Sequence, residues 1–528
     1  MSDPLSQLKA QNEALQRELD YYKNRSSLPV SREQSELLLG DSILIQGQVD
    51  STASTSIVVL GASGDLAKKK TFPSLFNLFG LGLLPPNTKI YGYSRSAMSN
   101  DEFRKHASQN FKEFMDKKEA FLSLLFYVTG HYDSHEDFAR LNKTLLEQES
   151  QHTANRLFYM AIPPTVYTQV ASSLKNHWKS ATGWNRIIFE KPFGMDLETS
   201  RELSASLGQV FEEDQIYRID HYLGKEMVQN LMVLRFANVV FEPLWNRQYI
   251  SSVTITFKED IGTEGRGGYF DTFGIIRDVM QNHLIQIFSL VAMEPPVTLE
   301  AKDVRDEKVK VLRACAPITA SDIVTGQFTA DKQGKNPGYL DDPGVPKTSK
   351  TPTFALACIH VNNARWHGVP LLLKCGKGMA ERKTEIRIQF KQSANPFFQS
   401  AAPNELVIRV QPNEAVYLKF NQKEPGLSSE IIQSELDLTY KSRFQTRVPD
   451  AYERLIHDAI RGDPNLFVRV DELEASWSIF TPVLHQIDEG KILPIPYHFG
   501  SRGPAEADEM AKRYGFHRNA DYVWSQKK

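Results

Sequence analysis

The chain has few cysteines and no long apolar run. Its three cysteines (Cys315, Cys358 and Cys375) are scattered along 528 residues, and none has the paired spacing of a zinc site or a redox motif. No run of about 18 consecutive apolar residues occurs, so we expect no membrane-spanning helix. The N-terminus lacks the basic and then apolar pattern of a secretory signal. These absences predict a reduced, cytoplasmic protein with no metal site and no membrane contact.

The chain also lacks an excess of either charge. It contains 62 Lys and Arg residues against 64 Asp and Glu residues, which gives a formal net charge of −2. A nearly neutral balance argues against a dedicated nucleic-acid-binding protein, although it leaves room for a local basic pocket.

The first 50 residues differ from the rest of the chain. Residues 1–50 are polar and contain no strand signal, and their apolar residues follow a heptad-like spacing over residues 8–22. Two heptads are too short to form a stable helix alone in water. We therefore expect either a flexible extension or a contact within an oligomer.

The rest of the chain shows two different patterns of apolar residues. In residues 51–220, short apolar runs alternate with helical stretches, which is typical of βαβ units in a parallel sheet; the runs lie at 57–60, 89–93, 156–161 and 186–189. In residues 221–528, alternating strands indicate a sheet with one covered face, and long helical patterns lie at about 270–292 and 450–462; the strands include 253–257, 385–390 and 405–410. The predicted fold is an α/β Rossmann-like coenzyme domain followed by a larger α+β domain with a mainly antiparallel sheet.

A glycine-rich turn follows the first apolar run. Gly61 permits a tight turn, Gly64 lets the backbone approach a pyrophosphate, and the next helical stretch offers free N–H groups to that charge. Ser63 stands at the middle position of the usual Gly-x-Gly-x-x-Gly pattern. The turn predicts dinucleotide binding, with a plain glycine turn as the alternative.

The end of the second predicted strand bears on which dinucleotide is bound. An NAD-specific site carries Asp or Glu there, to hold the ribose 2′-hydroxyl. This chain has Tyr-Ser-Arg-Ser, with Arg95 in the third position. A guanidinium binds a phosphate through two parallel hydrogen bonds. Unless Arg95 is a solvated surface residue, it favours NADP over NAD.

Two further segments concentrate polar side chains. Residues 218–225 (Arg-Ile-Asp-His-Tyr-Leu-Gly-Lys) place a carboxylate, an imidazole, a phenol and an ammonium within six residues at the start of a helical stretch. Residues 190–194 (Glu-Lys-Pro-Phe-Gly) end a predicted strand, where open α/β sheets bind ligands. The residues alone allow either an anion-binding site or a chance cluster of loop residues.

Together with the glycine-rich turn, these segments resemble the glucose-6-phosphate dehydrogenase family. The matching segments are 61–70, 190–194, 218–226, 262–271 (Gly-Thr-Glu-Gly-Arg-Gly-Gly-Tyr-Phe-Asp) and 277–284 (Arg-Asp-Val-Met-Gln-Asn-His-Leu). The resemblance runs from about residue 55 almost to the C-terminus. It implies oxidation of C1 of D-glucose 6-phosphate to 6-phosphoglucono-1,5-lactone with hydride transfer to NADP⁺, in the oxidative pentose phosphate pathway, by a homodimer or homotetramer.

The resemblance also implies roles for individual residues. His283 matches the general base, Asp220 the carboxylate that orients it, and Lys191 a catalytic lysine between sugar and nicotinamide. The implied substrate site consists of Lys191, His221, Tyr222, Lys225, Glu259, Asp278, Lys377, Arg382 and Gln411. The implied coenzyme site consists of Gly61, Ser63, Gly64, Asp65, Leu66, Arg95, Tyr167 and Lys191. Without the family, His283 would be interpreted as a packed core histidine and the charges as surface ion pairs.

Some family members hold a second, structural NADP in the α+β domain. The positions that match that site are Lys383, Arg387, Arg409, Lys419, Asp437, Arg502 and Trp524. Two positions depart from the pattern, because Lys374 replaces an arginine and Arg518 replaces a tyrosine. Lysine lacks the planar fork of arginine, and arginine lacks the aromatic face of tyrosine. The occupancy of this second site is left open.

The residues also bear on two alternatives to this activity. A dehydrogenase for another hexose phosphate would differ at the sugar-binding positions, which instead match the family. An NADP-binding sensor or scaffold without catalysis would be free to lose Asp220, His283 or Lys191, but all three are present. The residues therefore favour an enzyme that acts on glucose 6-phosphate.

Overall fold

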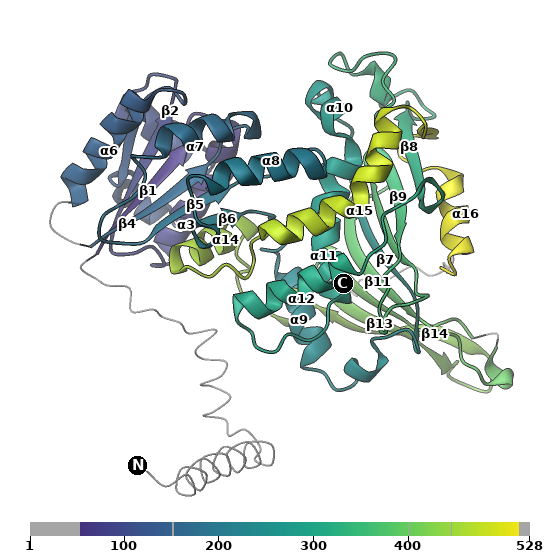
Figure 1. The fold of residues 1–528 in the computed structure, drawn as a ribbon. Helices are drawn as coiled ribbons and strands as arrows, with labels where there is room; N and C mark the ends of the chain where they lie inside the picture. Colours follow the sequence, from purple (N-terminus) through teal and green to yellow (C-terminus); the bar gives the residue numbers. More distant parts are fainter. Residues whose placement is uncertain (1–52, 150–152, 400, 445, 517–528) are drawn as a thin grey trace, which may run out of the picture. The chain divides into compact units, whose positions relative to one another are not determined.

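The computed structural model describes residues 53–149, 153–399, 401–444 and 446–516. The predictions made for residues 1–50 lie outside these ranges. The described residues form two sheets with their covering helices (Figure 1). None of the described helices is both long enough and apolar enough to cross a membrane.

The first sheet has six parallel strands in the order β3-β2-β1-β4-β5-β6, which confirms the predicted Rossmann-like sheet. Its strands are β1 (Ser54–Leu60), β2 (Asn87–Ser94), β3 (Leu125–Thr129), β4 (Ala154–Met160), β5 (Asn185–Phe189) and β6 (Ile216–Arg218). The sequence pattern missed β3 and β6. Both are edge strands: β6 has only three residues, and β3 is only partly buried although its residues 125–128 are all apolar.

Helices cover both faces of this sheet. Alternate residues of β1 point to opposite faces, so Val58 and Leu60 face one helical layer and Ile57 and Val59 face the other. The first layer contains α6 (His135–Glu149), α7 (Tyr167–Leu174) and α8 (Leu197–Gly208), and the second contains α3 (Phe72–Gly80), α4 (Asn100–Ala107) and α5 (Lys118–Leu122). Helix α14 (Ala451–Arg461) comes from far along the chain and packs on α3 in the second layer (Figure 1).

The second sheet has nine strands in the order β14-β13-β12-β11-β7-β10-β9-β8-β15. Its strands are β7 (Ile250–Lys258), β8 (Ile323–Thr329), β9 (Phe354–Ile359), β10 (Leu371–Gly376), β11 (Lys383–Phe390), β12 (Glu405–Gln411), β13 (Ala415–Lys423), β14 (Ile431–Thr439) and β15 (Ile495–His498). Only the β7–β10 and β8–β15 pairs are parallel, so the prediction of a mainly antiparallel sheet is confirmed.

The two faces of the second sheet differ in polarity. Val253, Ile255 and Phe257 of β7 belong to the apolar core on the helical side, whereas Thr254, Thr256 and Lys258 line a cavity on the other side. The helices on the apolar side are α9 (Glu226–Phe236), α11 (Ile285–Ala292), α12 (Ala301–Arg313) and α15 (Val470–Asp488). Helix α16 (Ala505–Arg513) contributes to the cavity, and α13 (Tyr440–Arg443) follows β14.

The helical pattern expected at 270–292 is interrupted. The segment consists of α10 (Gly267–Ile275), the π-helical stretch η7 (Ile276–Leu284) and α11, because Gly274 has a φ of +66° and breaks the first helix. π-Helical turns widen a helix and occur frequently at functional sites. Here η7 carries Asp278 and His283.

Candidate active site

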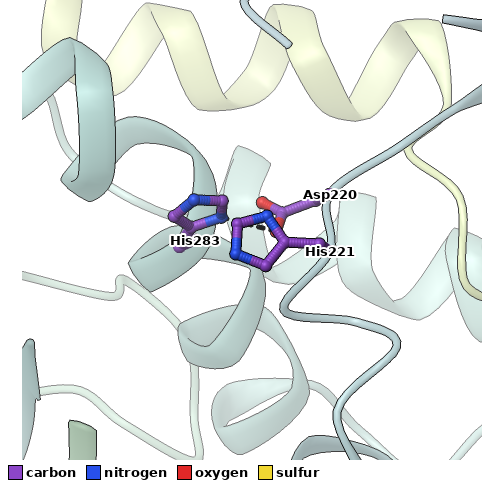
Figure 2. A group of neighbouring side chains, drawn as sticks. All are labelled: Asp220, His221 and His283. Carbon is purple, nitrogen blue, oxygen red and sulfur yellow. Dashed lines mark hydrogen bonds and ion pairs between the residues drawn. The ribbon is translucent and has the colours of Figure 1, made fainter. Parts of the chain in front are cut away.

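The centre of the site is a buried pair formed by Asp220 and His283. Asp220 follows β6 of the first sheet, and His283 lies on η7 (Figure 2). The Nδ1 atom of His283 and the Oδ1 atom of Asp220 are 2.6 Å apart, and the two residues are 3% and 2% exposed. The backbone amide of Tyr222 also donates to Oδ1 of Asp220, at 2.9 Å. The structure therefore brings the predicted base and its orienting carboxylate together.

The surroundings fix the charges of this pair. Burial alone would raise the pKa of Asp220, but His283 and His221 outweigh burial and hold that pKa at about 2. Burial lowers the pKa of His283, and Lys191 adds to this effect, although Asp220 opposes it. At neutral pH the carboxylate is thus ionised and the imidazole neutral. An ionised carboxylate only accepts hydrogen bonds, so Nδ1 carries the proton and Nε2 is left with a lone pair.

His221 lies beside this pair and is also neutral. Its ring centroid is 4.5 Å from that of His283, and the ring of Tyr452 stacks on it at 5.8 Å with an interplanar angle of 13°. Burial and the nearby His283 hold the pKa of His221 well below its usual range. Asp220, His221 and His283 offer ligand atoms within 4.8 Å of one another, close enough for one cation, but the Asp220–His283 hydrogen bond already engages one atom of each (Figure 2).

Lys191 connects the end of β5 to η7. Its ammonium donates to the carbonyl oxygen of Asp278 at 2.6 Å and to Oδ1 of Asp278 at 3.1 Å. Burial disfavours this ammonium, but Asp278 and Asp220 outweigh burial and raise the pKa of Lys191. Lys191 therefore carries its charge between the two predicted functional carboxylates.

Tyr167 fixes the backbone just before Lys191. Its hydroxyl donates to the carbonyl oxygen of Glu190 at 2.8 Å and accepts from the amide of Glu190 at 3.1 Å. The side chain is completely buried. The predicted contact between Tyr167 and the coenzyme stays a prediction, and in this structure Tyr167 contacts protein groups.

The remaining predicted substrate residues surround Tyr222 and η7. Gln411 donates to the hydroxyl of Tyr222 at 3.0 Å, and the ammonium of Lys225 lies 4.9 Å from the centre of the Tyr222 ring. Burial lowers the pKa of Lys225, and the neighbouring cations Lys70 and Arg382 add to this effect. Lys377 forms a 2.5 Å ion pair with Glu259. Lys225 thus lies beside Tyr222 with further cations near it, which suits an anionic ligand.

The glycine-rich turn has the geometry of a phosphate cradle. Gly61 has a φ of +83°, and a Cβ atom there would collide with the carbonyl oxygen of Ala161, so only glycine fits. The turn leads through Ser63, Gly64 and Leu66 into the π-helical stretch η1 (Ala67–Thr71), and Asp65 forms a 2.9 Å ion pair with Lys69. Arg95 is exposed just after β2 and forms no ion pair with any residue that the structure describes.

Sequence reasoning missed two contributors to the site. Thr384 of β11 lies 3.1 Å from the hydroxyl of Tyr222, and Tyr452 of α14 stacks on His221. Each is more than 150 positions from its partner along the chain. No local pattern marks either residue, because only the packing of α14 on the first sheet and of β11 in the second brings them to the site.

Apart from the active site, a cavity of about 730 Å³ lies on the polar face of the nine-stranded sheet, and we call it the second cavity. Basic side chains outnumber acidic ones in its lining: Lys258, Lys374, Lys383, Arg387, Arg409, Lys419 and Arg502 against Glu381, Glu385, Glu405 and Asp508. Burial and the nearby Lys258 lower the pKa of Lys374 to about 8, so positive charge is crowded here. Asp437 does not line this cavity, and Arg518 and Trp524 lie outside the described residues.

The fold and the site place the chain in the class of proteins with a Rossmann-like NAD(P)-binding domain and a second α+β domain. The family model described as "Glucose-6-phosphate dehydrogenase, NAD binding domain" matches residues 58–230, and the one described as "Glucose-6-phosphate dehydrogenase, C-terminal domain" matches residues 232–524. The chain belongs to the glucose-6-phosphate dehydrogenase family.

Individual known proteins with high similarity to this chain belong to the same family. The glucose-6-phosphate 1-dehydrogenase of Dictyostelium discoideum is 58% identical over 482 residues, which cover 90% of this chain and 97% of that protein. The Takifugu rubripes enzyme is 53% identical over 475 residues, 88% of this chain and 90% of that protein. A solved glucose-6-phosphate dehydrogenase in complex with glucose 6-phosphate matches with a TM-score of 0.85 and 47% identity, over 90% of this chain and 99% of that one. The structure of glucose-6-phosphate 1-dehydrogenase from Mycobacterium avium matches with a TM-score of 0.78 and 32% identity, over 90% of this chain and 99% of that one.

Proposed function

We propose that this protein oxidises C1 of D-glucose 6-phosphate to 6-phosphoglucono-1,5-lactone with NADP⁺ as the hydride acceptor, the first step of the oxidative pentose phosphate pathway. The buried Asp220–His283 pair carries this proposal, because it supplies a neutral, oriented imidazole in a site that also holds the charged Lys191. The names of the similar proteins support the same activity. A sensor or scaffold without catalysis would not require this neutral, oriented base.

His283 is the general base in this proposal. Its Nε2 atom accepts the proton of the C1 hydroxyl, and the negative charge of Asp220 stabilises the imidazolium that forms. The carboxylate also holds the tautomer, because the proton on Nδ1 stays in its hydrogen bond. NADP⁺, when bound, accepts the hydride from C1, and Lys191 contacts both sugar and nicotinamide in this proposal.

The other site residues bind and orient the sugar phosphate. His221, Tyr222 and Lys225, with Lys377 and Arg382, supply hydrogen-bond donors and positive charge for the phosphate dianion. Glu259, Asp278 and Gln411 supply acceptors for the sugar hydroxyls. The raised pKa of Lys191 and the lowered pKa of Asp278 support a charged pair at neutral pH.

The coenzyme is held by Gly61, Ser63, Gly64, Asp65 and Leu66 of the turn, with Tyr167 and Lys191 near the reacting end and Arg95 at the ribose 2′-phosphate. Gly61 permits the tight turn that presents backbone N–H groups, and Arg95 has no acidic partner among the described residues, so both features fit a phosphorylated dinucleotide.

The domain division, the oligomer and the location are proposals too. We assign residues 51–220 to coenzyme binding and 221–528 to substrate binding and association, with 1–50 as an extension. The edge strand β14 exposes Leu436 and Leu438, which supports a homodimer or homotetramer formed through the second sheet. A cytoplasmic location is supported by relatives named as cytoplasmic isoforms in Arabidopsis thaliana and Solanum tuberosum, although an Arabidopsis thaliana relative is chloroplastic.

Removing the base should abolish most of the activity without weakening substrate binding. We expect His283→Asn to lower kcat by about 10²–10⁴-fold, because general-base catalysis contributes that range, while KM for glucose 6-phosphate changes little. The measurement is NADP⁺ reduction followed at 340 nm with purified protein. Full activity of the variant would refute the base assignment.

The pH dependence of activity should report the lowered pKa of His283. As the pH falls through this pKa the ring gains a proton and can no longer accept one, so kcat/KM for glucose 6-phosphate should fall only below about pH 6.5, the ordinary histidine value. Asp220→Asn removes the charge that stabilises the imidazolium, so it should move this acid limb to still lower pH and also reduce kcat. Asp214→Asn, which changes an exposed carboxylate near β6, should leave the profile unchanged. An acid limb that moves upward in Asp220→Asn would contradict the proposed pairing.

Coenzyme preference should depend on Arg95. We expect Arg95→Ala to raise KM for NADP⁺ about 30- to 100-fold, because charge-assisted hydrogen bonds to the 2′-phosphate are lost, and to change KM for NAD⁺ less than threefold. Parallel assays with both coenzymes at saturating glucose 6-phosphate test this. Equal losses with both coenzymes would rule out the 2′-phosphate role.

We also propose that the second cavity binds another NADP. The crowding of positive charge that lowers the pKa of Lys374 supports a polyanionic ligand, because bound phosphates would neutralise the repulsion.

Binding at this cavity should be visible in the thermal stability of the protein. In the Arg95→Ala background, NADP⁺ at 100 times its Kd for this cavity should stabilise the protein by about 2.7 kcal/mol, seen as a higher thermal midpoint. Adding Lys374→Met should raise the midpoint without ligand and shrink the ligand-induced rise. An unchanged rise in the double variant would exclude binding next to Lys374.

A further inference from the structure

The turn between β3 and α6 places an aromatic ring against Arg95. Tyr132 lies in this turn, and the guanidinium carbon of Arg95 is 5.5 Å from the centre of its ring. Tyr132 is 9% exposed, whereas Arg95 is exposed. Among the residues that the structure describes, no carboxylate forms an ion pair with Arg95, so the ring is the partner that orients this side chain.

The turn itself is held to the end of β2. The amide of Gly130 donates to the carbonyl oxygen of Ser94 at 3.0 Å, and the hydroxyl of Tyr93 donates to the carbonyl oxygen of His131 at 2.8 Å. Gly130 is required for this approach, because a Cβ atom there would collide with the Tyr93 hydroxyl. The backbone just before Tyr132 is therefore fixed relative to β2, which ends immediately before Arg95.

Tyr132 also reaches the phosphate cradle. Burial raises the pKa of the Tyr132 hydroxyl, and Arg95 and the backbone amide of Gly61 act in the opposite direction, so both groups lie close to it. The ring of Tyr93 lies 6.1 Å from that of Tyr132. One buried side chain thus lies close to both the glycine-rich turn and Arg95.

We propose that Tyr132 is a positioning residue that sets the preference for a ribose 2′-phosphate by holding the guanidinium of Arg95. The inference rests on the proposed role of Arg95 in binding NADP. The negative ring face attracts the cation, and the N–H donors in the plane of the guanidinium remain available to a phosphate. Without the ring, a long and exposed arginine side chain would have to be ordered by the ligand alone, which weakens binding.

The test compares two ligands that differ only in the 2′-phosphate. Calorimetry on the full-length protein measures the Kd of adenosine 2′,5′-bisphosphate and of adenosine 5′-monophosphate, and their ratio isolates the 2′-phosphate contribution. We expect Tyr132→Leu to reduce this ratio about two- to fivefold, the range of an exposed cation–π contact. Tyr132→Phe keeps the ring and should keep the ratio within the error of the measurement. Arg95→Ala should reduce the ratio about 30- to 100-fold, and Tyr132→Leu added to it should have no further effect.

Any other result of these measurements shows whether the proposed role of Arg95 or that of Tyr132 is wrong. If Arg95→Ala leaves the ratio unchanged, the proposed role of Arg95 is wrong. If Arg95→Ala reduces the ratio but Tyr132→Leu does not, Arg95 binds the 2′-phosphate without help and the present inference is overturned. An equal loss of both ligands in Tyr132→Leu would mean that Tyr132 only supports the phosphate cradle. A loss in Tyr132→Phe as large as in Tyr132→Leu would assign the effect to the hydroxyl and overturn the role of the ring.

Discussion

The hydrogen bond between Asp220 and His283 joins the two sheets at the point where the chemistry is proposed to occur. Asp220 follows the last strand of the first sheet, and His283 lies on a helical stretch that packs against the second. A carboxylate that is 2% exposed needs partners, because an unpaired buried charge is very unfavourable. His283 and the backbone amide of Tyr222 supply them. The site is therefore complete only when the two sheets are assembled.

The position of His283 depends on contacts far from the dyad. Arg277, at the start of η7, donates to both carboxylate oxygens of Asp488 on α15 and to the carbonyl oxygen of Met195. Gln281 and Ser476 join η7 to the middle of α15. These side-chain bonds matter because a π-helical stretch lacks the regular hydrogen-bond ladder of an α-helix. Fixed on one side by α15 and on the other by Lys191, η7 can hold an imidazole within hydrogen-bonding distance of a carboxylate 63 positions away.

The sequence predicted local features well and long-range contacts only through resemblance. Strands β1, β4 and β5 were predictable because each contains a continuous apolar run, whereas β6 has only three residues and the apolar stretch of the half-buried edge strand β3 was missed. The phosphate turn was predictable because its glycines lie within four residues of one another. The pairing of Asp220 with His283 has no local signal and came from the family pattern alone. Tyr132 and Tyr452 were missed, because only tertiary packing brings them to Arg95 and His221.

A chain with a formal net charge of −2 nevertheless gathers basic side chains at two sites. In both, a lysine has a lowered pKa: Lys225 through burial and neighbouring cations, and Lys374 at about 8 for the same reasons. A lysine that binds its proton less tightly in the folded protein than in the unfolded chain opposes folding at neutral pH. A bound phosphate would reverse this repulsion at each site, and any ligand that binds only the folded protein stabilises it. An anion bound at either site would therefore offset the free energy that the crowded lysines cost the folded protein, and anion affinity and folding stability would depend on the same side chains.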